Sequence, residues 1–529
     1  MSNRPCKYYS VLVAFALLIE VHSARSQTVA ARDGLMDKSI AELSNDLQTN
    51  RITSVQLVHA YLAQIEALNR KGPALHAVIA INPDALSIAK KLDEERIEQG
   101  ARGPLHGIPI LLKDNIESTD PMATTAGSLA LLKNFAKHDA PVVARLRAAG
   151  AIILGKTNLS EWANFRSEHS ISGWSAVGGL TKNPHVLDRS ACGSSAGSAV
   201  AVAALFAAAS VGTETDGSIT CPASMNGVVG LKPTLGLLPQ QGIVPIAHSQ
   251  DTAGPMARSV ADVATMLDAM VGSKHGYAAS LSANSLAGKR IGVWRFRADR
   301  QQNIDVVYER ALQVLHAAGA TLIEVPTPES TRIEAAEETV LTTEFKTDLN
   351  VYLAATPSSV TMRTLGQLIA FNNMNEREHK LFGQELFVAA NAAKNLDDPT
   401  YKIALADSKR LAGAEGISRV LANEHLDFIV APTAGPSWRI DLVSGDQFPG
   451  SFSTLPAVSG YPHLTVPMGT IKSLPIGLSF IGPPLSEALL LSVGFAYEQK
   501  AKVNVHATFK PTLETEAEFN PIDRKKKSD

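Results

Sequence analysis

Three segments of the chain combine a possible nucleophile, a possible base and a possible anion-binding turn. Lys113 ends the apolar run 108–112, and Ser194 lies in a stretch of small residues. Ser218 follows the polar, glycine-containing segment 212–217. A serine hydroxyl is a weak nucleophile and needs a base within hydrogen-bond reach. A lysine removed from water can be that base, and successive N–H groups of a turn can stabilise an oxyanion. These residue types indicate acyl transfer.

Each segment taken alone has a simpler interpretation. Lys113 alone fits a strand-end lysine that reaches solvent, and 212–223 fits an ordinary polar loop. The stretch Gly193–Gly197 matches the G-x-S-x-G nucleophile elbow with Ser195 at its centre, but that motif requires a preceding strand. Residues 183–190 are typical of a loop instead, which disfavours an α/β-hydrolase.

Two cysteines, Cys192 and Cys221, flank these serines. No paired histidine motif accompanies either cysteine, so a cysteine nucleophile is not favoured. A disulfide between them is an open alternative in an exported protein, because the sequence does not give their separation. We expect them to pack as small buried groups.

Taken together, the three segments resemble the amidase signature family. In that family the nucleophilic serine lies 24 positions after a serine of the first small-residue stretch, the spacing between Ser194 and Ser218. The family's lysine lies in a G-x-P-x-x-x-K-D-N context, which residues 107–115 match. Further matching stretches are 124–128, 155–158, 183–184, 230–234, 254–258 and 431–433. The resemblance implies a single large α/β domain with a mixed, mostly parallel central sheet covered by helices.

The resemblance also implies a Ser-Ser-Lys triad without a histidine. Ser218 would attack the amide carbonyl and form an acyl-enzyme, and neutral Lys113 would take its proton through Ser194. In the family the bridging serine follows a cis peptide bond, which here would join Gly193 to Ser194. Ser195 would hydrogen-bond Lys113. The oxyanion hole would consist of the backbone N–H groups of Thr215, Asp216, Gly217 and Ser218.

Two residues depart from the Asp-Thr-Gly-Gly-Ser-Ile-Arg pattern of many family members. Asp216 replaces a glycine and Thr220 replaces an arginine. This variant, with the spellings at 192–195 and 221–222, resembles bacterial peptide amidases, which release ammonia from C-terminal amides. The implied function is hydrolysis of linear amides, most specifically peptide amides. An aryl- or fatty-acyl-amide hydrolase and an amidotransferase subunit that passes ammonia to a partner enzyme stay as alternatives.

The elements around these segments alternate between strand and helix patterns. Strands are predicted at 78–81, 108–112, 151–154, 290–294, 321–325, 428–430, 464–466 and 477–480, with helices between them. This alternation is typical of α/β proteins. Residues 326–425 are predicted helical and are expected to shape the acyl-side pocket, with candidate lining residues Phe345, Tyr352, Leu365, Phe371 and Phe382 that are otherwise interpreted as core. Glu376, Glu378 and His379 are interpreted as a solvated helix face.

Composition excludes several classes of protein. The chain has 529 residues, a net charge of −2, 45% hydrophobic residues and three cysteines. A disordered chain would be less apolar, and a nucleic-acid binder would carry a basic excess. The cysteines are too few for a disulfide scaffold, and the histidines show no metal-binding spacing, so neither a metal nor a cofactor is implied. Length alone suggests three or four domains. However, Lys113, Ser194 and Ser218 must converge in one site, and matching segments run past residue 480 with no linker between them, which favours one domain.

Residues 1–26 have the pattern of a secretory signal peptide. A basic start precedes the apolar run 11–19, and small residues at Ala24 and Ser26 indicate cleavage after Ser26. The run is shorter than the roughly 20 residues of a membrane span, so stable membrane insertion is not expected. We therefore expect residues 27–529 to be the catalytic domain and the protein to be exported to the periplasm or the medium.

Overall fold

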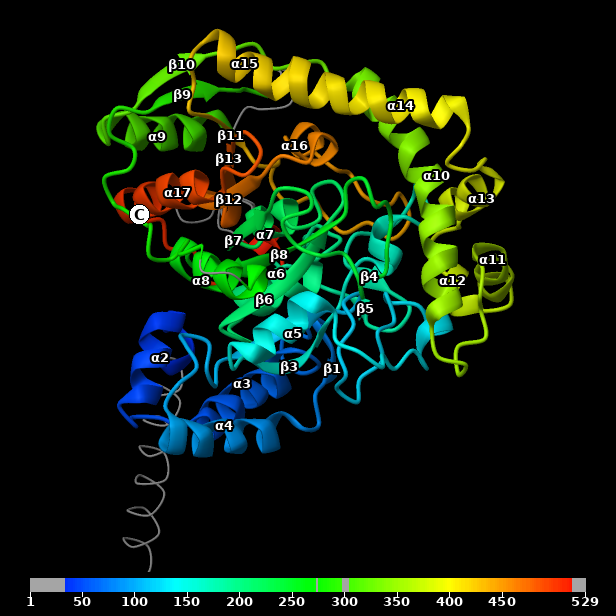
Figure 1. Ribbon diagram of the computed structural model, residues 1–529, viewed down its shortest axis with the longest axis horizontal. Helices are drawn as coiled ribbons and strands as arrows, with labels where there is room; N and C mark the ends of the chain where they lie inside the picture. Colours follow the sequence, from blue (N-terminus) through cyan, green and yellow to red (C-terminus); the bar gives the residue numbers. More distant parts are fainter. Residues whose placement is uncertain (1–33, 273–274, 297–303, 516–529) are drawn as a thin grey trace, which may run out of the picture.

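The computed structural model describes residues 34–272, 275–296 and 304–515. Within them, eleven strands form one sheet in the order β1-β3-β2-β6-β8-β7-β12-β13-β11-β9-β10, and β4 and β5 form a separate pair (Figure 1). In chain order the strands are β1 (Val78–Ile81), β2 (Pro109–Lys113), β3 (Ile152–Thr157), β4 (Trp174–Ser175), β5 (Gly179–Leu180), β6 (Ala209–Glu214), β7 (Val229–Lys232), β8 (Thr252–Ala257), β9 (Arg290–Val293), β10 (Thr321–Glu324), β11 (Phe428–Pro432), β12 (His463–Ile471) and β13 (Leu474–Ile481).

The large sheet is mixed, as predicted, and the predicted single large α/β domain is confirmed. Among the described strands, β3–β2, β2–β6, β11–β9 and β9–β10 pair in parallel, and the other six neighbouring pairs are antiparallel. The parallel share is smaller than the sequence pattern predicts. One reason is the hairpin β12–β13, whose two-residue turn at Lys472 and Ser473 has positive φ at both positions, the geometry that joins antiparallel strands.

Helices cover both faces of the sheet. The longer helices are α2 (Ile40–Gln48), α3 (Ser54–Leu68), α4 (Ala85–Gln99), α5 (Pro141–Ala148), α6 (Ala196–Ala203), α8 (Val260–Val271), α9 (Ile304–Ala317), α10 (Thr331–Ala355), α11 (Leu365–Asn373), α13 (Glu385–Ala392), α14 (Pro399–Lys409) and α17 (Glu487–Ala501). The shorter ones are α7 (Thr220–Met225), α12 (Glu376–His379), α15 (Ser418–Asn423) and α16 (Thr454–Ser459), with a π-helix at Arg410–Ile417 and 3₁₀ turns at Leu129–Leu131, Glu161–Asn164 and Leu513–Thr515.

Strand β8 shows how the two faces are filled. All of its residues are buried, and successive side chains of a strand point to opposite faces. Ala253 and Ala257 belong to the main apolar core, which includes residues of α8 and α17. Met256, of the other parity, packs in a separate cluster with residues of α6 and α7. Ala199 and Val202 of α6 thus pack against the Met256 face of β8, while other residues of the same helix belong to the main core.

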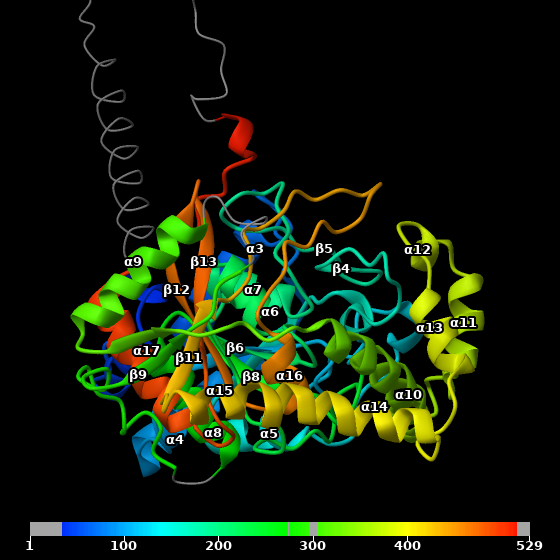
Figure 2. The same cartoon turned by 90° about the horizontal axis from the view of Figure 1, so that it is seen from above.

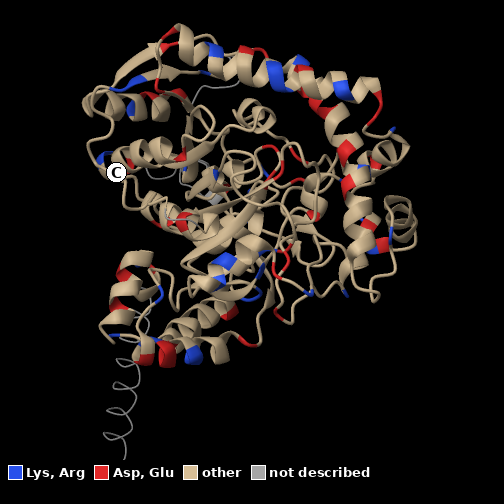
Figure 3. Cartoon of the chain, in the orientation of Figure 1, with Lys and Arg blue, Asp and Glu red and all other residues tan. Residues whose placement is uncertain are grey.

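The segment 331–423 leaves the sheet after β10 and returns before β11. It contains α10 to α15, so the predicted helical character is confirmed. Figures 1 and 2 show α11, α12 and α13 at the end of the molecule opposite α9 and α17. The central strands carry few charged residues, whereas α10 and α14 carry both signs (Figure 3). No helix within the described ranges is long and apolar enough to cross a membrane. The signal peptide predicted at 1–26 lies outside those ranges.

Candidate active site

Lys113 is the last residue of β2 and is completely buried, so the solvent-exposed interpretation is wrong. The apolar strand lies inside the sheet and carries the lysine with it. The Nζ atom donates to Ser194 Oγ at 2.7 Å and to Thr213 Oγ1 at 2.8 Å. Burial lowers the pKa of Lys113 to about 7, while the negative charges of Asp251 and Glu214 oppose that shift. The amine is therefore neutral in a substantial fraction of molecules at neutral pH.

The small-residue stretch brings two serines to Lys113 and to the loop of Ser218. The Gly193–Ser194 peptide bond is cis, as the resemblance implies. The Ser195 N–H donates to the carbonyl oxygen of Ser218 at 3.1 Å. Ser195 Oγ donates to the Thr213 carbonyl at 3.0 Å and makes no bond to Lys113, contrary to the sequence-based expectation. Thr213 is thus the residue that connects Ser195 to Lys113.

No strand precedes this stretch. Residues 181–195 form a loop with isolated bridges rather than a strand that enters a nucleophile elbow. A side chain at position 193 is impossible without movement, since a Cβ there would lie 2.1 Å from Ser160 Oγ. The segment is therefore held closely by its neighbours, and its first glycine is required by space.

Ser218 lies in a tight loop between β6 and α7. Gly217 has φ +74°, and the N–H groups of Asp216, Gly217 and Ser218 have no acceptor among the described residues. Such a run of free N–H groups is a suitable site for an oxyanion. The Ser218 hydroxyl likewise makes no hydrogen bond with described residues. Glu214 Oε2 holds the far end of the loop by accepting from Ile219 N at 2.8 Å and from the next backbone N–H at 2.9 Å.

The side chain of Asp216 introduces a carboxyl group into this loop. Its Oδ2 accepts from Thr454 Oγ1 at 2.8 Å, whereas Oδ1 is enclosed and has no donor, although the residue keeps some solvent contact. Burial raises the pKa of Asp216 to about 6. Burial, together with the charge of Asp216, raises the pKa of Glu337 on α10 well above its usual range. Gln250 joins the two elements, since its Nε2 donates to Glu337 Oε1 at 2.7 Å.

The loop of Ser218 lines a cavity of about 460 Å³, whereas Lys113 and Ser194 lie behind the lining residues. Most of the lining comes from three parts of the chain: the loop 215–218 with Gly193 and both cysteines, the loop 164–172, and the segment 438–448. Their side chains in the lining include Asn164, Phe165, Ser167, Glu168, Ser170, Ser172, Trp438, Asp446 and Phe448. From the segment 326–425 only Leu341 lines it in the described structure, and the predicted aromatic candidates of that segment pack in the core instead. A larger cavity of about 680 Å³, between α2, α8 and α17, contains none of the candidate catalytic residues.

Cys192 and Cys221 form a disulfide bond, so our expectation of unbonded cysteines is wrong. Their Cα atoms lie 6.1 Å apart because the small-residue stretch and α7 meet at the cavity wall. The bond connects the residue before Gly193 to the helix that follows Ser218. The two chemistry-bearing segments are therefore covalently joined.

A buried ion cluster attaches the helical segment to the cavity wall. Arg166 Nη1 lies 2.9 Å from Glu161 Oε1 and 3.2 Å from Glu378 Oε2, and all three side chains are excluded from solvent. The solvated face predicted around Glu378 is therefore wrong for this residue, although Glu376 is exposed. The local sequence does not indicate the burial of Glu378, because its partner Arg166 comes from a loop more than 200 positions earlier.

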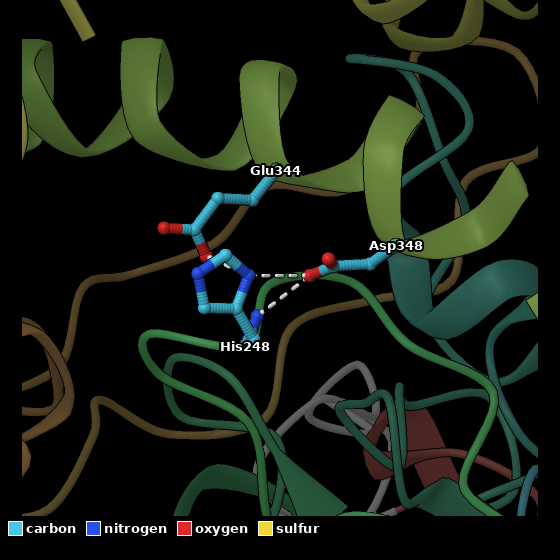
Figure 4. Close-up of side chains that lie close together, drawn as sticks. All are labelled: His248, Glu344 and Asp348. Atoms are coloured by element: carbon cyan, nitrogen blue, oxygen red, sulfur yellow. Dashed lines mark hydrogen bonds and ion pairs between the residues drawn. The ribbon is translucent and has the colours of Figure 1, made fainter. Parts of the chain in front are cut away.

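Three further side chains of metal-ligand type lie together at His248, Glu344 and Asp348 (Figure 4). His248 Nδ1 is 2.8 Å from Asp348 Oδ2 and 3.4 Å from Glu344 Oε2. Glu344 also accepts from Tyr401 Oη and from the Ser249 N–H. These contacts join the loop before β8 to α10, and each of the three groups already has a protein partner.

Comparisons with known proteins identify the family of the chain. The amidase family model matches residues 56–491. A probable amidase of Arabidopsis thaliana is 38% identical over 514 residues, covering 92% of this chain and 95% of the relative. A glutamyl-tRNA(Gln) amidotransferase subunit from Halorhodospira halophila is 34% identical, covering 87% of this chain and 97% of the relative. The solved peptide amidase of Stenotrophomonas maltophilia is 49% identical with a TM-score of 0.85, covering 89% of this chain and 99% of the other.

Proposed function

The chain belongs to the amidase family and is a hydrolase of amide C–N bonds, and from that premise we propose that it releases ammonia from the C-terminal amides of peptides. The observation that carries this proposal is the hydrogen bond from the buried Lys113 amine to Ser194 Oγ. The next residue, Ser195, donates its N–H to the Ser218 carbonyl and so connects this pair to the loop of the nucleophile. The 49% sequence identity to the peptide amidase of Stenotrophomonas maltophilia supports a peptide amide as the substrate.

In the proposed mechanism Ser218 is the nucleophile. Its Oγ attacks the carbonyl carbon of the amide while its proton passes to Ser194 Oγ, and Ser194 gives its own proton to neutral Lys113. The backbone N–H groups of Thr215, Asp216, Gly217 and Ser218 stabilise the negative oxygen.

Breakdown of the tetrahedral intermediate reverses this proton path. Ser194 returns a proton to the leaving nitrogen, ammonia departs, and an ester between Ser218 and the acyl group remains. Water activated through the same relay then hydrolyses the ester. Because burial lowers the pKa of Lys113, its amine can act as a base near neutral pH.

Export is part of the proposal. The signal pattern of residues 1–26 directs the chain out of the cytoplasm. In the oxidising environment outside it, a bond between Cys192 and Cys221 is stable. Amidotransferase work on charged tRNA takes place in the cytoplasm, so export disfavours that alternative.

Ammonia release from a substrate panel tests the proposal. The panel contains a peptide amide, an aryl amide, a fatty-acyl amide and free glutamine, each given to wild type and to Ser218→Ala. We expect release from the peptide amide by wild type alone. Preference for glutamine with a required partner protein, or for the aryl or fatty-acyl amide, would replace the peptide-amide proposal with the corresponding alternative.

A further inference from the structure

The charged groups of the cavity wall all have one sign. The lining contains the carboxyl groups of Glu168, Asp216 and Asp446, and within the described structure no lysine, arginine or histidine belongs to it. Helix α10, which contributes Leu341 to the lining, carries five acidic and two basic residues (Figure 3), although the raised pKa of Glu337 disfavours the charged form of that residue. The guanidinium of Arg166, which lies in the same loop as Glu168, is neutralised by two buried glutamates. The cavity is therefore a region of negative potential.

The three carboxyl groups differ in how many hydrogen bonds they already accept from the protein. Asp446 accepts from Ser172 N at 2.9 Å and from Trp438 Nε1 at 3.0 Å. Asp216 is bonded at Oδ2 and has an enclosed, unpartnered Oδ1. Glu168 is exposed and makes no hydrogen bond or ion pair with a described residue. Glu168 is thus the wall carboxylate that is most available to a ligand.

This charge distribution limits the substrates of the proposed reaction. When the leaving group is ammonia, every other atom of the substrate belongs to the acyl part, so any charge on the substrate lies on the acyl side. A carboxylate there would have no cation in the wall to pair with, and its desolvation would be uncompensated. A lysine, arginine or α-ammonium group would instead meet carboxylates.

We propose that Glu168, with the acidic cavity wall, selects peptide amides that carry a positive charge near the scissile amide and disfavours those that carry a negative charge. The inference rests on the proposed peptide-amide function and names the substrate class within it.

Binding to the inactive Ser218→Ala variant tests the selection separately from turnover. The probes are the N-acetyl amides of lysine, norleucine and glutamate, which have similar size and differ in charge. We expect the lysine amide to bind about tenfold more tightly than the glutamate amide at low ionic strength, with norleucine between them. The ratio should shrink as added salt screens the exposed charge.

A second substitution identifies the residue responsible. In the Ser218→Ala background, Glu168→Gln should reduce the lysine-to-norleucine ratio about threefold, and Glu168→Lys should reverse the order of the charged probes. The matched control is Glu376→Gln, an exposed glutamate of α12 outside the cavity lining, which should leave all three affinities unchanged.

Equal affinities for the three probes, or a ratio that survives Glu168→Gln, would overturn the inference. The proposed function is judged by a different measurement, since it fails if wild type releases no ammonia from the norleucine amide. The affinity series answers the question of charge selection in either case.

Discussion

Replacement of Lys113 by methionine should stabilise the fold while it abolishes turnover. Methionine is similar in length, is apolar and suits the buried end of β2. The native state lowers the pKa of Lys113 from 10.5 to about 7, chiefly by burial. Between these two values the unfolded chain binds one proton more than the native protein, so the wild type becomes more stable as the pH rises. The methionine variant lacks this term.

The expected magnitude follows from the size of the shift. Lowering the pKa of Lys113 from 10.5 to about 7 corresponds to roughly 5 kcal/mol of free energy of unfolding. The wild type is destabilised by this full amount only well below pH 7, where the native lysine is protonated. The advantage of the Lys113→Met variant should therefore shrink by about 2 kcal/mol between pH 7 and pH 9. The hydrogen bonds that methionine removes alter the absolute difference, but they alter it equally at both pH values.

Equilibrium urea unfolding of both proteins at the two pH values measures this change. The matched control is Lys91→Met on α4, an exposed lysine whose charge stays in water in both states. Its difference from wild type should not vary with pH. A stability difference for Lys113→Met that is the same at both pH values would refute the assignment of a largely neutral buried amine. The wild-type activity should also fall as the pH drops below about 7, where Lys113 becomes protonated.

Other variants test separate parts of the site. Ser218→Ala should abolish ammonia release without lowering the unfolding midpoint, and retained activity would point to another nucleophile. Asp216→Asn should be more stable than wild type by about 3 kcal/mol at pH 7 but not at pH 4, since the raised native pKa of Asp216 costs wild-type stability as the pH rises from about 4 to about 6; an equal gain in urea unfolding at both pH values would contradict this. Arg166→Gln should lower the free energy of unfolding by about 3–5 kcal/mol because it leaves two buried glutamates unpaired, whereas the exposed Arg410→Gln should cost less than about 1 kcal/mol; a similar loss in both would show that burial is not the cause.

Much of the fold and part of the site could be predicted from local sequence. Strand and helix positions follow from the periodicity of apolar residues, because that periodicity reports which face of an element is buried. The burial of Lys113 follows from its place at the end of an all-apolar strand once the neighbouring motifs are considered together.

Other features depend on contacts between distant residues and could not be predicted in this way. The bond between the cysteines required the distance at which α7 meets the small-residue stretch. The burial of Glu378 required Arg166 as a partner, and the raised pKa of Glu337 required the nearby charge of Asp216 in a loop more than 100 positions earlier. The order of strands in the sheet is likewise set by tertiary packing, which is why the balance of parallel and antiparallel pairs differed from the prediction.

The disulfide has a consequence for the integrity of the chain. Because Cys192 and Cys221 are bonded, the segment between them is a closed ring that contains Ser194, Thr213 and Ser218. A protease that cuts one peptide bond inside this ring opens it but releases no fragment, so both serines stay on a single covalent molecule. In the exported enzyme that we propose, this ring would keep both serines on one covalent molecule after a single cleavage by a protease.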